Sequence, residues 1–365
     1  MKNYRKEEEF VMDFEKIFES YGYEKIKLNT FEKYDTYFAN KDMINEGNLL
    51  KIMNPKGDLY VLRPDMTLPV VKYFSEQQAK RGKFYYNDSV FRADKNGLEF
   101  NERKQVGIEY LGGENILSDV EILDLAVQTL EKLDPNYILC ISNTEFIKEM
   151  VNSVIEEEQA RERILEYLYR RSSDLENYLK NIGIEEEKIV KLLKLNRLFG
   201  NFERVKETLY EMAVTDKQRK ILEDLETILK ALGKKYPQDK IEIDFSISVA
   251  LQYYNGLIFK GYISDIKKPI LSGGRYDKLV TRFGKDASAL GFCLEIDNYF
   301  ESIKRERTKI DYLLFYSDLE NGFEAMEKAR EYRKNGKTVR VLSEDKSESN
   351  EELNQKYSTI QYFCG

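Results

Sequence analysis

The sequence of 365 residues contains no histidine and only three cysteines. The absence of histidine removes the side chain that serves most often as a general base and as a metal ligand. Cys140, Cys293 and Cys364 are odd in number and far apart in the chain, so they predict neither a disulfide framework nor a zinc site. We therefore expect a protein without a metal ion or another cofactor.

Long apolar segments are also missing. The chain opens with charged residues between Tyr4 and Phe10, which a signal sequence would not, and no apolar run reaches membrane length. Acidic residues outnumber basic ones by 65 to 58, and the net charge of -7 argues against a surface built for nucleic-acid binding. These features predict a soluble cytoplasmic protein that binds neither membranes nor nucleic acid.

The stretch from Lys83 to Gly113 predicts a long antiparallel hairpin with a turn near Asp94, Asn96 and Gly97. Charged side chains on strands need partners, so a polar face on this hairpin predicts a ligand that carries both charges. The residues assigned to that face are Arg92, Glu102, Arg103, Gln105 and Glu109.

Other elements follow from periodicity and turn signals. Apolar spacing predicts a helix over Glu8–Ser20, and the next residues predict a strand over Glu24–Phe31. The pattern of Glu145–Tyr236 is helical, charged and almost free of strand signals, whereas the Gly273-Gly274 pair predicts a turn. Beyond Lys309 the pattern changes to alternating strands and helices.

Five segments resemble the class II aminoacyl-tRNA synthetases, in the version found in histidyl-tRNA synthetase and its paralogues. They are LRPDMTLPV at Leu62–Val70, FRAD followed by ER and QVGIEYLGG within Phe91–Gly113, LQYYNGLIF at Leu251–Phe259, SGGRYDKL at Ser272–Leu279 and ALGFCLEID at Ala289–Asp297.

The resemblance implies an α+β fold, with an antiparallel sheet flanked by helices. The expected synthetase-like domain spans residues 1–144 and 238–304, a helical insertion spans 145–237, and a truncated anticodon-binding-like α/β domain spans 309–365. The helix and strand at the N-terminus match motif 1, the dimer interface of these enzymes, although Asn29 stands where its proline is expected.

Residues that handle ATP in the synthetases are replaced at the matching positions. Val249 and Gln252 stand where histidyl-tRNA synthetase has a catalytic arginine and an aspartate, and Asn298 replaces the motif 3 arginine. Glu295 replaces a glycine, and Arg103 replaces the aromatic residue that stacks on adenine. Removing one preorganised charge costs roughly a hundredfold to a thousandfold in rate, so the resemblance predicts that no residue of this chain is catalytic.

The amino-acid pocket of the synthetase is retained. By the same matching, Arg92 pairs with the substrate carboxylate, Asp65, Thr67 and Gln105 surround its amino group, and Glu109, Tyr254 and Tyr276 lie at the imidazole. The resemblance therefore implies a site for free histidine.

This combination resembles the regulatory subunits of short-form ATP phosphoribosyltransferase, which opens histidine biosynthesis. Membership of that family implies that this chain forms a homodimer within a hetero-octamer with a separate catalytic subunit. The chain would activate the catalytic subunit and would help to inhibit it when L-histidine is abundant. The lack of histidine residues fits a protein needed when histidine is scarce, or reflects drift toward Lys, Asn, Tyr and Ile. The alternatives are a purely structural assembly subunit and an active histidyl-tRNA synthetase.

Overall fold

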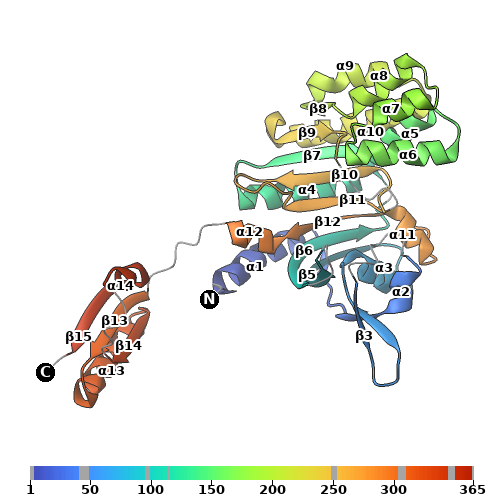
Figure 1. Cartoon of the computed structure of the whole chain (residues 1–365). Helices are drawn as coiled ribbons and strands as arrows, with labels where there is room; N and C mark the ends of the chain where they lie inside the picture. Colours follow the sequence, from blue (N-terminus) through green and yellow to red (C-terminus); the bar gives the residue numbers. More distant parts are fainter. Residues whose placement is uncertain are drawn as a thin grey trace. The chain divides into compact units, whose positions relative to one another are not determined.

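A computed structural model of the chain describes residues 4–40, 49–94, 99–113, 115–247, 253–302, 310–343 and 350–363. Contacts between Cα atoms divide the chain into two compact units, Met1–Ser302 and Ile303–Gly365 (Figure 1). The predicted turn residues Asn96 and Gly97, and also Cys364, lie outside the described residues.

The larger unit is built on a sheet that has nine strands within the described residues. Its order is β1-β5-β6-β12-β11-β10-β7-β9-β8, and neighbours are antiparallel except for the parallel pairs β1–β5 and β7–β9. The strands are β1 Glu24–Lys25, β5 Gly82–Ala93, β6 Phe100–Leu111, β7 Ile138–Asn143, β8 Phe199–Gly200, β9 Ile241–Asp244, β10 Leu257–Tyr262, β11 Leu271–Arg275 and β12 Ala289–Glu295. This sheet with its flanking helices confirms the predicted α+β fold.

The predicted hairpin is the pair β5–β6, which runs from Gly82 opposite Leu111 to Ala93 opposite Phe100. Residues directly opposite one another share a face, and successive residues alternate between faces. Arg92 lies opposite Asn101, so it shares a face with Arg103, Gln105 and Glu109. Glu102 lies opposite Phe91 on the other face. The prediction that Glu102 lies on the polar face of the hairpin is therefore wrong.

Helices cover the sheet and close the core. Helices α1 (Tyr4–Ser20) and α4 (Ile116–Leu133) lie along it, and α1 buries Phe14 and Phe18 while α4 buries Leu123 and Leu130. The predicted helical segment forms a cluster at the β7–β9–β8 end (Figure 1), and its apolar side chains join the same core as the sheet. Its helices are α5 Thr144–Asn152, α6 Glu158–Arg170, α7 Leu175–Asn181, α8 Glu186–Leu195, α9 Phe202–Met212 and α10 Asp216–Gly233.

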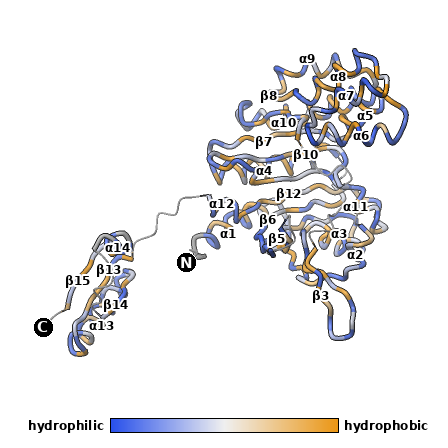
Figure 2. Tube along the Cα trace, in the orientation of Figure 1, coloured by the Kyte–Doolittle hydropathy of each residue, from blue (hydrophilic) through white to orange (hydrophobic). Residues whose placement is uncertain are grey.

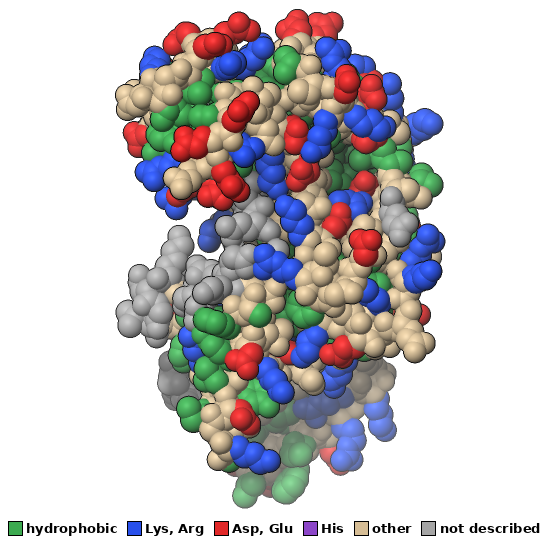
Figure 3. All heavy atoms as spheres, turned by 90° about the vertical axis from the view of Figure 1, so that its right-hand side faces the viewer, with side chains coloured by type: hydrophobic (Ala, Val, Ile, Leu, Met, Phe, Trp, Pro, Cys, Tyr) green, Lys and Arg blue, Asp and Glu red, His purple; other side chains and the backbone are tan. Residues whose placement is uncertain are grey.

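A small antiparallel sheet with the order β2-β4-β3 belongs to the same unit. Its strands are β2 Phe31–Lys33, β3 Leu50–Met53 and β4 Leu59–Leu62, and the nearby helices are α2 Tyr34–Phe38, α3 Thr67–Glu76 and α11 Asp277–Arg282; α12 Ile296–Ser302 follows β12. Figure 3 shows acidic and basic side chains intermingled on one face of the molecule.

Two sequence predictions need correction. The strand expected over Glu24–Phe31 is interrupted between β1 and β2, because the carbonyl groups of Leu28 and Asn29 accept hydrogen bonds from the Arg63 side chain. Gly273 and Gly274 lie inside strand β11 and do not form a turn. A Cβ atom at Gly273 would overlap the carbonyl oxygen of Gly291, so glycine is needed there for close packing of β11 against β12.

The C-terminal unit has a parallel sheet with the order β14-β13-β15. Its elements are β13 Ile310–Tyr316, α13 Leu319–Lys334, β14 Val339–Ser343, α14 Asn350–Lys356 and β15 Tyr357–Phe363. Ala325 and Ala329 of α13 pack on one side of the sheet, and Leu353 packs on the other. Figure 2 shows hydrophobic residues along the strands of both units. Among the described residues, each helix is too short or too polar to cross a bilayer.

Arg63 joins several segments of the larger unit, and its side chain is 1% exposed. Its Nε donates to the carbonyl oxygen of Ser89 at 2.8 Å, and its Nη1 donates to the carbonyl oxygens of Leu28 at 2.9 Å and Asn29 at 3.3 Å. The guanidinium also forms an ion pair with Asp88. One buried cation thus joins the second half of β5, the end of β4 and the chain between β1 and β2.

Replacing Arg63 by methionine removes every one of these donors and leaves the carboxylate of Asp88 without its cation. We expect the free energy of unfolding, measured by urea denaturation followed by circular dichroism, to fall by about 3–5 kcal/mol. The control is Arg170→Met, which breaks a pair with Glu166 whose side chains are 75% and 48% exposed. This change should stay within about 0.5 kcal/mol. Equal losses in both variants would contradict the structural role of Arg63.

Candidate functional site

The carboxyl group of Glu109 is the centre of the site. Glu109 lies on β6 and is 2% exposed. The Thr67 Oγ1 hydroxyl donates to Glu109 Oε1 at 2.7 Å, and the Tyr276 hydroxyl donates to Glu109 Oε2. Burial raises the pKa of Glu109 to about 8, although both hydroxyls stabilise the ionised form. The start of α3 and the residue before α11 thus meet at one buried carboxyl group.

Space for this carboxyl group comes from a glycine on the neighbouring strand. Gly291 of β12 lies directly opposite Glu109. A Cβ atom at Gly291 would overlap both Glu109 Oε2 and the carbonyl oxygen of Ile108. Glycine at position 291 therefore lets the Glu109 side chain lie over β12.

Asp65 and Arg92 bring opposite charges to the same region. Asp65 Oδ1 accepts a hydrogen bond at 2.8 Å from the backbone N–H of Leu68, in the first turn of α3. Asp65 Oδ2 is buried and has no hydrogen-bond partner within the described part of the chain. Burial raises the pKa of Asp65, and the nearby Arg92 opposes that shift. Arg92 donates from Nε to the carbonyl oxygen of Pro64 at 2.6 Å.

Aromatic rings lie close to the Glu109 carboxyl group. The ring centroids of Tyr253 and Tyr254 lie 4.7 Å apart in an edge-to-face arrangement, and those of Tyr253 and Tyr276 lie 5.8 Å apart. Burial raises the pKa of Tyr254, and the charge of Glu109 adds to this shift. Tyr254 therefore presents a neutral phenol beside the carboxyl group.

Sequence reasoning missed two residues of this region. Tyr253 lies within hydrogen-bonding reach of Thr67, and burial raises the pKa of Tyr253 well above its usual value. Burial also raises the pKa of the Cys293 thiol, and Asp65, Arg92 and Glu109 all lie close enough to act on it. The adjacent tyrosines could have indicated Tyr253, but only the sheet register places Cys293 here.

Gln105 forms a side-chain hydrogen bond that the sequence did not predict. It is 3% exposed and lies on the same strand face as Glu109. Its Nε2 donates to Glu295 Oε1 at 2.6 Å, because Gln105 and Glu295 lie directly opposite each other on β6 and β12. The structure thus brings Asp65, Thr67, Arg92, Glu109, Tyr254 and Tyr276 together, and it holds the amide of Gln105 against Glu295.

The positions matched to ATP handling are partly described. Val249 and Gln252 lie outside the described residues. Arg103 Nη1 lies 3.3 Å from Glu301 Oε1 in a partly exposed ion pair. The Asp297 carboxylate accepts a hydrogen bond from the backbone N–H of Lys104 at 2.8 Å. Asp297 directly precedes Asn298 in α12. Three consecutive residues of β6, namely Arg103, Lys104 and Gln105, therefore each contact a carboxylate group.

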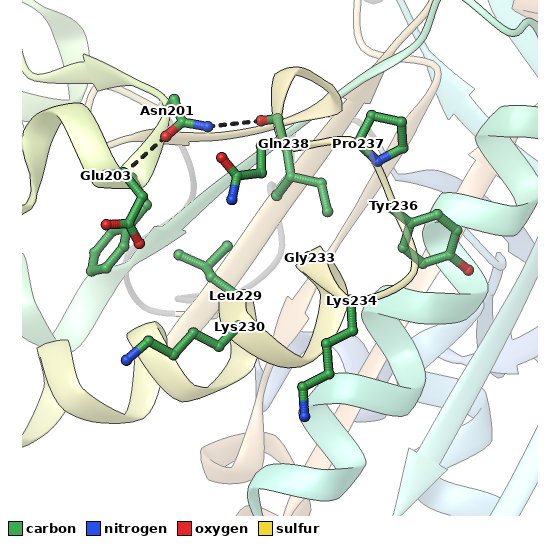
Figure 4. Close-up of a pocket in the computed structure, with 11 residues that line it drawn as sticks. Asn201, Glu203, Leu229, Lys230, Gly233, Lys234, Tyr236, Pro237 and Gln238 are labelled. Atoms are coloured by element: carbon green, nitrogen blue, oxygen red, sulfur yellow. Dashed lines mark hydrogen bonds between the residues drawn. The ribbon is translucent and has the colours of Figure 1, made fainter.

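A separate cavity of about 210 Å³ lies at the base of the helical cluster (Figure 4). Asn201 donates from Nδ2 to the carbonyl oxygen of Gln238 at 2.9 Å on its rim, and Leu229 and Tyr236 belong to its lining. None of the predicted site residues lines this cavity. Among the described residues, no group of three or more Cys, Asp or Glu side chains could hold a metal ion.

Comparisons with known proteins give the family. The histidyl-tRNA synthetase family matches residues 2–299. The ATP phosphoribosyltransferase regulatory subunits of Bacillus cereus (strain AH820) and Bacillus thuringiensis (strain Al Hakam) are each 31% identical over 343 residues, which cover 91% of this chain and 81% of theirs.

Solved structures share the fold. A regulatory subunit/histidyl-tRNA synthetase from Bacillus halodurans C is similar over 100% of this chain and 96% of that chain, with a TM-score of 0.84 and 24% identity. A chain of the ATP phosphoribosyl transferase complex from Thermotoga maritima is similar over 80% of this chain and 97% of its own, with a TM-score of 0.63 and 20% identity.

The match over residues 2–299 and the identity to the Bacillus proteins lead to one conclusion: the chain belongs to the histidyl-tRNA synthetase family, within the group of ATP phosphoribosyltransferase regulatory subunits.

Proposed function

We propose that the chain is a cytoplasmic, non-catalytic subunit that binds free L-histidine and regulates a separate short-form ATP phosphoribosyltransferase catalytic subunit. It activates that subunit and transmits feedback inhibition by histidine. The observation that carries this proposal is the buried carboxyl group of Glu109, which lies beside an unpartnered oxygen of Asp65 and the guanidinium of Arg92. Such a site suits a small molecule with a cation, an anion and a ring N–H.

Each polar group of histidine has a counterpart in the proposed site. Glu109 and Tyr254 would hold the imidazole, with Tyr276 fixing the carboxyl group of Glu109. The Arg92 guanidinium suits the ligand carboxylate, since a charge-assisted, bidentate contact is strong and directional. Asp65 Oδ2 and the Thr67 hydroxyl would receive the amino group, with the Gln105 amide next to them on β6.

The proposed lack of synthetase activity rests on the charges around the ATP positions. Phosphoryl chemistry needs cations that are preorganised against phosphate. Here Glu295 replaces a glycine and accepts from Gln105, and Arg103 pairs with Glu301. Negative side chains at this edge would repel a triphosphate.

The proposed partner follows from the relatives. Curated relatives are named regulatory subunits, and the Thermotoga maritima neighbour is part of an ATP phosphoribosyl transferase complex. We expect this chain to form a homodimer within a hetero-octamer with its catalytic partner. Histidine would bind one conformation of that assembly more tightly, with a coupling free energy on the order of 1–3 kcal/mol.

The change Glu109→Gln tests the proposed pocket. It keeps the shape of the side chain but removes the carboxyl group, which would ionise when it accepts a hydrogen bond from the bound imidazole. A hydrogen bond to a charged group contributes about 1.5–3 kcal/mol, so half-maximal inhibition of the reconstituted complex should need roughly tenfold to a hundredfold more histidine. Inhibition of the catalytic activity at increasing histidine concentration measures this shift.

Glu102→Gln is the matched control, since Glu102 is exposed on the opposite face of the same strand. It should leave inhibition unchanged. If both variants respond to histidine as the wild-type complex does, the chain is a structural assembly subunit and the pocket proposal is wrong.

The raised pKa of Glu109 also predicts a pH effect on stability. Its folded pKa of about 8 lies above its ordinary value of 4.5, so its contribution is fully present below 4.5 and is lost as the pH rises to about 8. Between about pH 5.5 and 7.5, the unfolding free energy of the ligand-free wild type should fall relative to Glu109→Gln by about 1.4 kcal/mol per pH unit.

Urea denaturation at several pH values measures this difference. The absence of histidine leaves few other side chains that titrate in this range. Parallel pH profiles for the two proteins would mean that the carboxyl group of Glu109 is already ionised in the folded protein.

A further inference from the structure

Two tyrosines of the proposed histidine site lie next to a network of polar side chains. Tyr254 directly precedes Asn255. Tyr276 lies between Arg275 and Asp277. The Nδ2 of Asn255 donates to Asp277 Oδ2 at 2.9 Å, although the two residues are 22 positions apart in the chain. This pair therefore joins the segment before β10 to the start of α11, one residue away from each tyrosine.

Both oxygens of the Asp277 carboxylate accept hydrogen bonds. Oδ2 accepts from Asn255, and Oδ1 accepts from the backbone N–H of Ala289 at 2.7 Å. The carbonyl oxygen of Ala289 in turn accepts from the backbone N–H of Tyr276 at 2.8 Å. Ala289 begins β12, the strand next to Glu109. One carboxylate thus holds the segment before β10 and the residue before α11 against the start of β12.

The Arg275 guanidinium supports the same carboxylate. Its Nη1 lies 3.3 Å from Asp277 Oδ1, and its Nη2 donates to Asp119 in the first turn of α4. The side chains of Arg275 and Asp119 are each 15% exposed. The backbone N–H of Asn255 also donates to the carbonyl oxygen of Arg275 at 2.8 Å. Several linked contacts therefore hold these polar groups in one geometry, as a satisfied polar network does.

We propose that the Asn255–Asp277 pair is a positioning element of the histidine site, which keeps Tyr254 and Tyr276 beside the Glu109 carboxyl group. The inference rests on the proposed function. Asn255 and Asp277 act through the two tyrosines and need no contact with the ligand. The Tyr276 hydroxyl can donate to Glu109 only while the residue before α11 is held in place.

An exchange of the two side-chain types separates this role from a general loss of stability. Asp277→Asn alone leaves one oxygen for two donors, so the new NH₂ group faces either the Asn255 amide or the Ala289 N–H. Asn255→Asp alone sets two carboxylates against each other. In the double variant, the new amide at position 277 accepts from Ala289 and donates to the new carboxylate at position 255. Both hydrogen bonds are then restored.

Calorimetric titration of each purified full-length chain with L-histidine measures the effect. Each single change should raise the dissociation constant at least about tenfold, and the double variant should return to within about threefold of the wild type, since residues in direct contact are energetically coupled. Thr281→Ala is the control, because it removes a hydrogen bond from the exposed Thr281 side chain to the Asp277 carbonyl oxygen. It should leave the dissociation constant unchanged.

Amide hydrogen exchange of the ligand-free chains shows whether the loosening is local. Exchange should be faster in the single variants around residues 253–256 and 276–277, and the double variant should match the wild type. If Asp277→Asn does not fold, Asn255→Ala takes its place, because it removes the donor without adding a charge, and it should weaken histidine binding at least about fivefold.

Single variants that bind histidine as the wild type does would overturn the inference. A double variant that binds as weakly as the single variants would overturn it too, and in both cases the proposed function would stand. A wild-type chain that does not bind histidine would instead overturn the proposed function and this inference with it.

Discussion

The burial of the Glu109 carboxyl group is the constraint on which the proposed site depends. A carboxyl group in this position is costly to ionise, and the hydroxyls of Thr67 and Tyr276 offset only part of that cost. Gly291 supplies the space, and the sheet register supplies the position. Helices α3 and α11 and strands β6 and β12 must therefore be in place before the Glu109 carboxyl group can bind a ligand.

Under the proposed function, a synthetase-like fold would recognise an amino acid without activating it. The proposed histidine residues Glu109 and Thr67 lie near the end of β6 and at the start of α3, whereas the positions matched to ATP handling lie toward the start of β6, at the end of β12 and on α12. Glu295 accepts a hydrogen bond from Gln105, and the Glu109 carboxyl group keeps its hydrogen bonds from Thr67 and Tyr276. The proposed site would keep its polar groups for histidine, and catalysis would belong to the proposed partner subunit.

Local sequence signals predicted several of the helices and strands, whereas the contacts between residues far apart in the chain depend on tertiary packing. The β5–β6 hairpin follows from alternation and a turn signal, and α13 from the alternation of strand and helix patterns beyond Lys309. The turn predicted at Gly273 is wrong, because glycine serves both tight turns and close strand packing, and the sequence does not distinguish these two uses. Cys293 and the Gln105–Glu295 pair could not be predicted, since they depend on which residue of β12 lies opposite β6. The roles of the seven histidine-binding residues stay predictions.

Calorimetric titration of the purified chain, first with L-histidine and then with ATP, tests the central claim most directly. The account predicts that histidine binds with a saturable signal, that Arg92→Ala abolishes this binding, and that ATP gives none. Tight binding of ATP would contradict the account and would favour the alternative that the chain is an active histidyl-tRNA synthetase. Absence of histidine binding would contradict it in the other direction, since the Glu109 site would then be a structural feature of an assembly subunit.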